Sequence, residues 1–446
     1  MKRPPSSPSA PHDRTPQVWL DVTTSWRERS GQSNGTLRVE GSYGAALSQI
    51  MGPRLHLSRY IRTTKRFLPV ASLPKLDGNR SSGRHRSLGP AASTDAPSLK
   101  KIGRNIERSF RTFWRGGLGW AVQQLDTHSG TTPFSDARPG DVLLLAGETW
   151  SQYDFDVLRQ LRRAHQLRLA AICQDLIPVK CPQYFESGAF VERFRSYADF
   201  LVSDVDLLLA ISNSTKADIL DHARLHGGIQ GRLETIRLGA DFDSAAVPEK
   251  PDALADLVPG TFVLSVSTLQ SRKNFDLLYR LWQRFSAQRL PNLPRLVIVG
   301  RRGFGSADLL WQMSHDPLVE KSITVVHTIS DSELSWLYKN CLWTLYPSFY
   351  EGWGLPVSES LAHGKYCLAS DSSSLPEAGE GLIRHLDPLD FRSWQEAIAE
   401  LVGKPAILAE YEKRIASTYR PLGWLESAKR LDEKLQELLL RPTQTS

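Results

Sequence analysis

The sequence has no apolar run that could cross a membrane. Its longest runs, such as VDLLLAI at 205–211, have the length of a strand, whereas a spanning helix needs about 18 or more apolar residues. The first sixteen residues, MKRPPSSPSAPHDRTP, are charged but lack the apolar core of a secretory signal. We therefore expect a disordered leader over residues 1–16, followed by a protein that is neither secreted nor embedded in a bilayer.

Cysteine is also scarce. The four cysteines, Cys173, Cys181, Cys341 and Cys367, form no CxxC pair and no framework spacing, which argues against disulfides and against a structural zinc site. We expect them to be reduced thiols of a cytoplasmic protein. The remaining composition, with 41% hydrophobic and 23% charged residues, is typical of a soluble globular protein.

Positive charge is concentrated in one segment. Residues 51–115 contain fifteen Lys or Arg and three acidic residues, a balance of 15 − 3 = +12, so the rest of the chain carries 7 − 12 = −5. A local basic patch favours an anionic partner, either a membrane surface or a nucleic acid. The alternative is a solubilising insertion. Within this segment, residues 71–99 are rich in Ser, Gly, Pro and Arg without periodicity, which predicts a partly disordered insertion.

Strand and helix patterns alternate along the chain. Strand-like runs such as DVLLLAGETW (141–150) are followed by amphipathic stretches such as YDFDVLRQLRRAHQ (153–166). The proline-containing stretch at 245–260 predicts a linker, and the alternation restarts after it. This pattern predicts two doubly wound α/β domains, at 17–244 and 261–417, which face each other across a cleft with ligands at the carboxyl ends of both sheets.

Two glutamates flank a glycine loop in the second domain. The segment YEGWGLPVSES places Glu351 before Gly352 and Gly354, and Glu359 eight residues after Glu351. Pro356 suits the first helical position, so we expect Glu359 in the first turn of a short helix whose free N–H groups can bind phosphate. The two carboxylates could accept hydrogen bonds from hydroxyls at both ends of a sugar nucleotide. Alternatively, Glu359 only complements the helix dipole and Glu351 is a surface acid.

A pair of cations follows the first strand of the second domain. VLSVSTLQSRKN places Arg272 and Lys273 between that strand and a helical stretch. Such cations can neutralise a diphosphate leaving group without a metal ion. An exposed Arg-Lys pair is more often merely solvated, so its meaning depends on the surrounding motifs.

Together these motifs resemble those of the retaining glycosyltransferases of family 4, which have the two-domain GT-B fold. The resemblance covers most of residues 17–437. YEGWGLPVSESLAHGKYCLASDSSSLPE resembles the E-x7-E signature with its following strand, and SRKN resembles the phosphate-binding pair. VGRRGFG, ISNSTKADI, RLGADFD and HLDPLD occur at the expected places and in the expected order. The resemblance also implies that a last helix, at 418–437, crosses back to the first domain.

The resemblance implies a role for each matching residue of the second domain. Glu351 would bind hydroxyls of the donor sugar, and Glu359 would bind the ribose. Arg272 and Lys273 would bind the diphosphate, with Ser267 near the same phosphates. Backbone N–H groups of the glycine loop would hold the sugar and phosphate, and the residues of that loop are Gly352, Trp353, Gly354 and Leu355.

In the first domain, QDLIPVKCPQYF resembles the family's His-Asp-Leu-Ile-Pro stretch, with Gln174 in place of the histidine. Asp175 is retained and is a candidate at the reaction centre; its alternative role is to cap the turn before Pro178. A glutamine cannot shuttle protons, so Gln174 cannot replace the histidine as an acid or base. NGTLRVE resembles the N-terminal loop of such enzymes, with Gly35 near the diphosphate and Arg38 nearby.

The segment from QVWLDVTT to GTLRVE resembles the corresponding segment of bacterial family members that build surface polysaccharides, often mannosyltransferases. This implies retaining transfer of a hexose, with GDP-mannose as the donor, to a hydroxyl of a lipid-linked oligosaccharide. No metal and no cofactor are expected, since the nucleotide sugar is a co-substrate. The enzyme would lie in the cytoplasm, peripheral to the inner face of the cell membrane, with its basic segment near anionic lipid and no bound nucleic acid.

Other patterns support alternative interpretations. Asp204 and Asp206 have the DxD form of metal-dependent glycosyltransferases, although acids before an apolar strand are usually solvated. A non-catalytic protein that binds nucleic acid through the basic segment is a further alternative. His222 and His226 are spaced i, i+4 and could bind zinc, but the sequence shows no third ligand, which favours a surface pair. Trp353 is the one tryptophan placed within the glycine loop.

Overall fold

The computed structural model describes residues 16–27, 35–74, 134, 136–240 and 247–439. One compact unit is formed by residues 1–78 together with 137–446, and it contains both sheets described below. The other unit, residues 79–136, lies almost wholly outside the described residues. The predicted leader and most of the predicted insertion at 71–99 also lie outside them.

The first domain is built on a sheet of seven described strands in the order β3-β2-β1-β4-β5-β6-β7. Neighbouring strands are parallel except β3, which runs antiparallel to β2 at the edge. β4, β5 and β6 are buried along their whole length, as expected for apolar strands with helices on both faces of the sheet. The strands are β1 (Val18–Asp21), β2 (Leu55–Ile61), β3 (Arg66–Val70), β4 (Val142–Leu145), β5 (Arg168–Cys173), β6 (Leu207–Ala210) and β7 (Arg232–Thr235).

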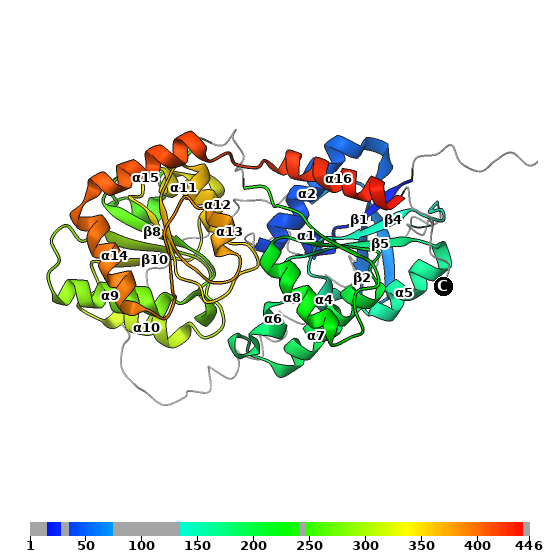
Figure 1. The fold of residues 1–446 in the computed structure, drawn as a ribbon, viewed down its shortest axis with the longest axis horizontal. Coiled ribbons are helices and arrows are strands. Elements are labelled where there is room, and N and C mark those ends of the chain that lie inside the picture. The colour runs from blue at the N-terminus through cyan, green and yellow to red at the C-terminus, as the bar shows by residue number, and fades with distance from the viewer. Residues whose placement is uncertain (1–15, 28–34, 75–133, 135, 241–246, 440–446) are drawn as a thin grey trace, which may run out of the picture. The chain divides into compact units, whose positions relative to one another are not determined.

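Helices connect these strands and cover the sheet (Figure 1). They are α1 (Thr23–Arg27), α2 (Gly35–Met51), α4 (Thr149–Gln152), α5 (Phe155–His165), α6 (Ile177–Lys180), α7 (Gly188–Asp204) and α8 (Asn213–Arg224), with short 3-10 turns η1 (Gly52–Arg54) and η3 (Pro182–Tyr184). Side-chain caps fix several of their starts. Ser187 accepts a hydrogen bond from the Phe190 N–H at the start of α7, and Ser212 accepts one from the Thr215 N–H at the start of α8.

The second domain is built on a fully parallel sheet in the order β10-β9-β8-β11-β12-β13. This is the strand order of a doubly wound nucleotide-binding fold, in which the order reverses between the first and fourth strands. Here that reversal lies between β8 and β11. The strands are β8 (Phe262–Val266), β9 (Arg295–Val299), β10 (Ile323–Val326), β11 (Thr344–Tyr346), β12 (Cys367–Ser370) and β13 (His385–Leu386).

The helices of this domain alternate with its strands. They are η4 (Asp252–Leu254), η5 (Ser271–Lys273), α9 (Phe275–Ala287), α10 (Ala307–His315), α11 (Asp331–Asn340), α12 (Leu355–Ala362), α13 (Leu375–Gly379), α14 (Phe391–Gly403) and α15 (Pro405–Thr418). Large buried side chains, among them Trp282, Trp343 and Trp394, fill the space between helices and sheet. Leu254 and Leu257, in the predicted linker, are buried against β8 and β9, so the second domain packs on its own leading segment.

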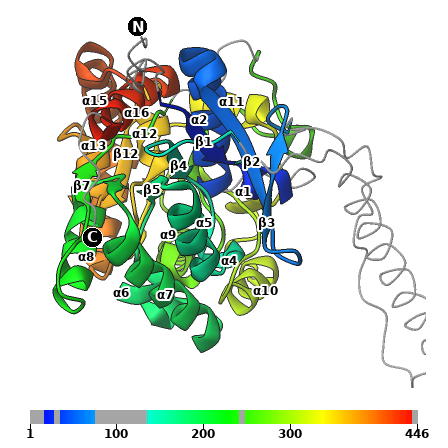
Figure 2. The ribbon, with the colours of Figure 1, turned by 90° about the vertical axis from the view of Figure 1, so that its right-hand side faces the viewer.

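The last described helix, α16 (Trp424–Leu439), lies beside α2 of the first domain (Figures 1 and 2). The Tyr43 hydroxyl and the Ser427 hydroxyl are 2.7 Å apart, and Arg54 pairs with Asp432 at 3.1 Å. No helix among the described residues combines the length and the apolar character that a bilayer crossing demands. The two doubly wound domains predicted from the sequence are confirmed.

Candidate functional site

The two motifs of the second domain meet at the carboxyl ends of adjacent strands. Ser267 directly follows β8, and Arg272 and Lys273 form the turn η5 five residues later. Glu351 follows β11, which pairs with β8. The strand order reverses between β8 and β11, and the carboxyl ends of such strands are the usual place for a ligand in this fold.

Glu351 is held by both cations. Its Oε1 is 2.6 Å from the Lys273 Nζ, and its Oε2 is 3.0 Å from Arg272 Nη1. All three side chains are nearly buried: Glu351 is 8% exposed, and Lys273 and Arg272 are each 11% exposed. Lys273 also donates to the Tyr346 hydroxyl at 3.0 Å, and Arg272 donates to the Tyr350 carbonyl oxygen. The sequence pattern therefore produces a compact, buried cluster of two cations and one carboxylate.

The charges of this cluster depend on one another. Burial on its own would raise the pKa of Glu351, but the neighbouring Arg272 and Lys273 outweigh it and hold that pKa at about 2. Burial lowers the pKa of Lys273 to about 8, against the attraction of Glu351. At pH 7 all three groups are thus charged, and the cluster carries a net charge of +1 that suits an anionic ligand.

Two serines that the sequence reasoning did not single out fix Glu351 and the glycine loop that follows it. The Glu351 N–H donates to the Ser373 hydroxyl at 2.7 Å. The Ser374 hydroxyl donates to the carbonyl oxygens of Glu351 and Trp353, at 3.0 and 2.9 Å. The run SDSSSL after β12 is the signal that could have indicated them, since small hydroxyl residues at a strand end often bond to nearby backbone.

The structure explains why glycine occupies two positions of this loop. Gly354 has a φ of +105°, which strongly favours glycine, and it precedes the first residue of α12. A Cβ at Gly352 would collide with the carbonyl oxygen of Gln174 and lie 3.0 Å from the Asp175 Cβ, so the loop touches the first domain directly. Trp353 is buried and donates to the Ser358 hydroxyl at 3.0 Å, so it is a core residue and not a platform for a sugar.

The sequence predicted Glu359 in the first turn of its helix, and this prediction is wrong. The helix begins at Leu355, one residue before Pro356, so Glu359 is the fifth residue of α12 and lies in its second turn. The carboxylate is buried and engages side chains instead of helix N–H groups: it pairs with Arg38 of α2 and accepts a hydrogen bond from the Tyr338 hydroxyl at 2.8 Å. Arg38 is thus brought to the E-x7-E motif from the other domain.

The remaining predicted residues lie around this centre to different degrees. Asp175 is within the electrostatic reach of Arg272, Glu351 and Lys273, and burial raises its pKa. Its Oδ1 accepts a hydrogen bond from the Ile177 N–H at 3.0 Å, so the expected cap of the turn before Pro178 is present. Its place at the reaction centre stays a prediction. Gly35 opens α2 in an exposed position, and no described contact joins it to the cluster.

Gln174, which stands where the family's motif has histidine, makes hydrogen bonds within the first domain. Its side-chain amide donates to the Ala146 carbonyl oxygen at 3.1 Å, and its own carbonyl faces Gly352. Ser267 lies against the glycine-bearing turn that follows β9, because a Cβ at Gly300 would collide with the Ser267 carbonyl oxygen. That turn therefore borders the segment leading to Arg272.

Helix α8 links the first domain to the same loop. The N–H groups of Asn213 and Ser214 donate to the two carboxylate oxygens of Glu377 in α13, each at 2.8 Å. The Thr215 hydroxyl donates to the Gly352 carbonyl oxygen at 3.2 Å. Asp218, about one turn further along α8, accepts a hydrogen bond from the Tyr350 hydroxyl at 2.7 Å. Residues from two domains thus surround the glycine loop.

The alternative DxD pair is engaged in ion pairs and is not merely solvated. Asp204 pairs with Arg159 at 2.8 Å, and Asp206 pairs with Arg162 at 2.6 Å. The Leu169 N–H also donates to Asp206, at 2.7 Å. These carboxylates tie α5 to the start of β6, which is a structural use of the motif.

Part of the basic segment is committed to internal contacts. Among the described residues of 51–115, Arg54 pairs with Asp432, Lys65 pairs with Asp154 at 2.6 Å, and the Arg59 guanidinium lies 4.4 Å from the centre of the Trp26 ring. The free positive charge of the segment therefore depends mainly on residues beyond 74, which lie outside the described part of the chain.

Comparisons with known proteins agree with this fold and with the family resemblance of the sequence. Residues 249–418 match the family model described as glycosyl transferases group 1. O-antigen chain mannosyltransferase B of Escherichia coli is 29% identical over 238 residues, which cover 51% of this chain and 59% of that protein. The serotype-specific mannosyltransferase WbdA of Escherichia coli is 21% identical over 285 residues, 62% of this chain and 34% of WbdA. The chain thus spans about a third to three fifths of the length of these relatives.

Solved structures share the whole architecture. Sucrose-phosphate synthase from Thermosynechococcus elongatus has a TM-score of 0.59 and 17% identity, with 95% of this chain and 99% of that chain covered. Anabaena HepE in complex with UDP and glucose has a TM-score of 0.58 and 14% identity, with 95% and 100% covered. At these identities the likeness establishes the fold only. The chain thus has the GT-B fold, its residues 249–418 match the glycosyl transferases group 1 model, and it resembles bacterial O-antigen mannosyltransferases.

Proposed function

We propose that this chain transfers mannose from GDP-mannose to a hydroxyl of a lipid-linked oligosaccharide, with retention of the anomeric configuration and without a catalytic metal. The observation that carries the proposal is the buried cluster of Arg272, Lys273 and Glu351 at the carboxyl ends of β8 and β11. The choice of mannose rests on the names of the relatives, which include O-antigen chain mannosyltransferases.

The cluster supplies the charge that departure of a nucleoside diphosphate requires. In this mechanism the diphosphate takes Arg272 and Lys273 as its partners, and its negative charge replaces that of Glu351. Glu351 is then free to accept hydrogen bonds from hydroxyls of the sugar. The acceptor hydroxyl attacks on the face that the nucleotide leaves, and a phosphate oxygen takes its proton, so that stabilisation of charge matters more than a strong side-chain base.

The ribose end of the donor is assigned to Glu359. Its two present partners, Arg38 and Tyr338, hold the carboxylate in place before a ligand arrives. Asp175, which lies close to Gly352 and to both cations, is assigned to the sugar side of the reaction centre. Gly35 is assigned to the diphosphate side through its place at the start of α2, the helix that carries Arg38.

The acceptor is assigned to the first domain, and the enzyme to the cytoplasmic face of the cell membrane. A basic segment near anionic lipid gains about 1 kcal/mol per Lys or Arg close to the surface. Because Arg54, Arg59 and Lys65 are already engaged, this attraction depends mainly on the exposed Arg62 and Arg66 and on the basic residues after position 74.

A thermal-shift titration with GDP-mannose, UDP-sugars and ADP-sugars in the presence of EDTA tests the donor assignment. GDP-mannose is expected to raise the melting temperature by several degrees in this metal-free buffer. A shift with UDP-sugars alone would overturn the choice of donor. A shift that requires added Mn²⁺ would instead favour the metal-dependent alternative through Asp204 and Asp206.

Lys273→Ala tests the chemistry. Transfer from GDP-mannose should fall about 10²–10³-fold, by analogy with the removal of one donor that stabilises transition-state charge. Lys365→Ala is a matched control, since Lys365 pairs with Glu412 at 3.1 Å at the other end of the sheet, before β12. Unchanged turnover in Lys273→Ala, with the control equally active, would remove Lys273 from the proposed mechanism.

A further inference from the structure

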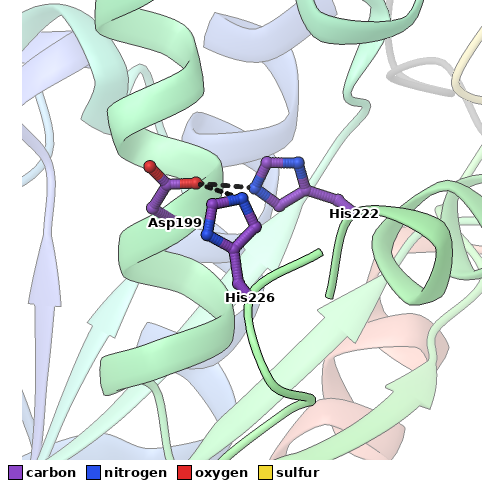
Figure 3. Close-up of side chains that lie close together, drawn as sticks. All are labelled: Asp199, His222 and His226. Atoms are coloured by element: carbon purple, nitrogen blue, oxygen red, sulfur yellow. Dashed lines mark hydrogen bonds and ion pairs between the residues drawn. The ribbon is translucent and has the colours of Figure 1, made fainter. Parts of the chain in front are cut away.

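A group of two histidines and one aspartate lies outside the site described above. His222 is in the last turn of α8, His226 follows the end of that helix, and Asp199 is on the neighbouring helix α7. The Asp199 Oδ1 is 2.8 Å from His222 Nε2 and 3.2 Å from His226 Nε2 (Figure 3). The third ligand that the sequence did not reveal therefore comes from a residue 23 positions before His222.

The geometry of the three groups suits a tetrahedral metal. Zinc bonds to nitrogen and oxygen at about 2.0–2.1 Å, so two ligand atoms on adjacent corners of a tetrahedron are separated by about 3.3 Å. The two nitrogen–oxygen separations are close to this value, and all three ligand atoms lie within 4.8 Å of one another. Small rotations of the side chains would place a cation between them without moving either helix.

Both imidazole rings are oriented toward the same point. They stack with their centres 4.5 Å apart and their planes at 26°, and each directs its Nε2 to the one carboxylate oxygen (Figure 3). In the metal-free state a single oxygen can accept an N–H from each of two neutral rings. A cation would instead take the Nε2 lone pair of each ring, and each neutral ring would then carry its one proton on Nδ1.

The burial of the three groups differs in a way that suits binding from solution. The His222 side chain is 5% exposed, whereas His226 and Asp199 are 36% and 41% exposed. One ligand is thus fixed in the interior, and two line an open side through which an ion can enter. Arg195, the nearest other charge on α7, is paired with Glu192 at 3.0 Å.

We propose that Asp199, His222 and His226 bind one zinc-class divalent cation, with the fourth position open to water. Two imidazoles and a carboxylate suit zinc, whereas Mg²⁺ and Mn²⁺ prefer sets made of oxygen ligands. The ion is structural, because it joins α7 to α8 and lies outside the residues assigned to the donor.

The place of this site on α8 gives it a second consequence. The amino-terminal half of α8 carries Thr215, which donates to Gly352, and Asp218, which accepts from Tyr350. Fixing the carboxyl-terminal end of the same helix to α7 limits its movement relative to the glycine loop. The metal would therefore stabilise the arrangement of the loop as well as the first domain.

Isothermal titration of the full chain, freed of metal, with ZnCl2 tests the proposal. We expect one equivalent to bind, and His226→Ala and Asp199→Asn to weaken binding at least about tenfold. Both changes are at partly exposed side chains, so the fold should survive, and circular dichroism checks this. His315→Ala is the matched control, because His315 is an exposed histidine at the end of α10.

The same proteins give a second readout by thermal unfolding. Zinc should raise the melting temperature of the wild type and of His315→Ala but not that of His226→Ala, and MgCl2 should have no effect. The proposal would be overturned if the wild type bound no zinc, if His226→Ala bound it as tightly as the wild type, or if His315→Ala lost it. None of these outcomes depends on glycosyl transfer.

Discussion

Replacing Glu351 by glutamine tests the central electrostatic argument. The change keeps the size of the side chain but removes the one carboxylate that pairs with both Arg272 and Lys273. Two buried cations then lose their ion-pair partner, and Asp175 acts on them only through its charge at longer range. A pKa of about 2 in place of 4.5 corresponds to about 3 kcal/mol of interaction between the carboxylate and its surroundings. Removing one partner of a buried ion pair costs about 3–5 kcal/mol in general. We therefore expect Glu351→Gln to lower the free energy of unfolding by about 3 kcal/mol.

The assay is urea unfolding at pH 7, followed by tryptophan fluorescence, for the wild type and two variants. Glu412→Gln is the control. The Glu412 side chain pairs with Lys365 and is 34% exposed, and losing such a surface ion pair lowers the free energy of unfolding by no more than about 1 kcal/mol. Equal stability of Glu351→Gln and the wild type would refute the idea that the cluster is held by charge.

Adding GDP extends the experiment to ligand binding. If the diphosphate takes over the role of the carboxylate, GDP should stabilise Glu351→Gln more than it stabilises the wild type. A larger effect on the wild type would contradict that exchange while leaving the stability argument intact.

Two further predictions concern other parts of the fold. Burial and the nearby charge of Asp21 raise the pKa of Glu40 to about 8, so between pH 4.5 and 8 the unfolded chain has lost a proton that the folded protein keeps, and stability falls as pH rises. At about 1.4 kcal/mol per pKa unit, the loss of stability over this range is of order 5 kcal/mol. Glu40→Gln should remove this pH dependence, and parallel stability–pH curves for the two proteins would contradict the prediction. Gly352→Ala should lower the melting temperature and weaken GDP binding because its Cβ meets the Gln174 carbonyl oxygen, whereas Gly403→Ala, at a position with open space, should be neutral in both measurements.

Much of the fold was predictable because its strands are apolar runs of the right length. β4, β6 and β8 all lie within runs that the sequence pattern predicts as strands. The edge strands β3 and β7 were missed, since RFLPV contains a proline and RLET is polar and only partly buried. β7 is half-buried along its whole length, so it has neither the apolar run of a central strand nor the alternation of a strand with one buried face.

The site was predictable as a set of residues but not as a set of contacts. The E-x7-E spacing and the Arg-Lys pair indicated Glu351 and the two cations, because their chemistry is local to two short motifs. No local pattern shows that Arg38 would reach Glu359, 321 positions along the chain, or that Asp199 would complete the histidine pair. Such pairings depend on how whole helices pack, and a single sequence does not encode that in any short window.

The carboxylate of Glu377, in α13 of the second domain, accepts hydrogen bonds from the first two N–H groups of α8 in the first domain. These two N–H groups can therefore report on movement between the domains. If α13 moves away from α8, the N–H groups of Asn213 and Ser214 lose their acceptors together. Both amides then become open to solvent, and their hydrogen–deuterium exchange accelerates in step. Two backbone amides in the first domain can therefore measure how often the two domains separate, with no label and no added ligand.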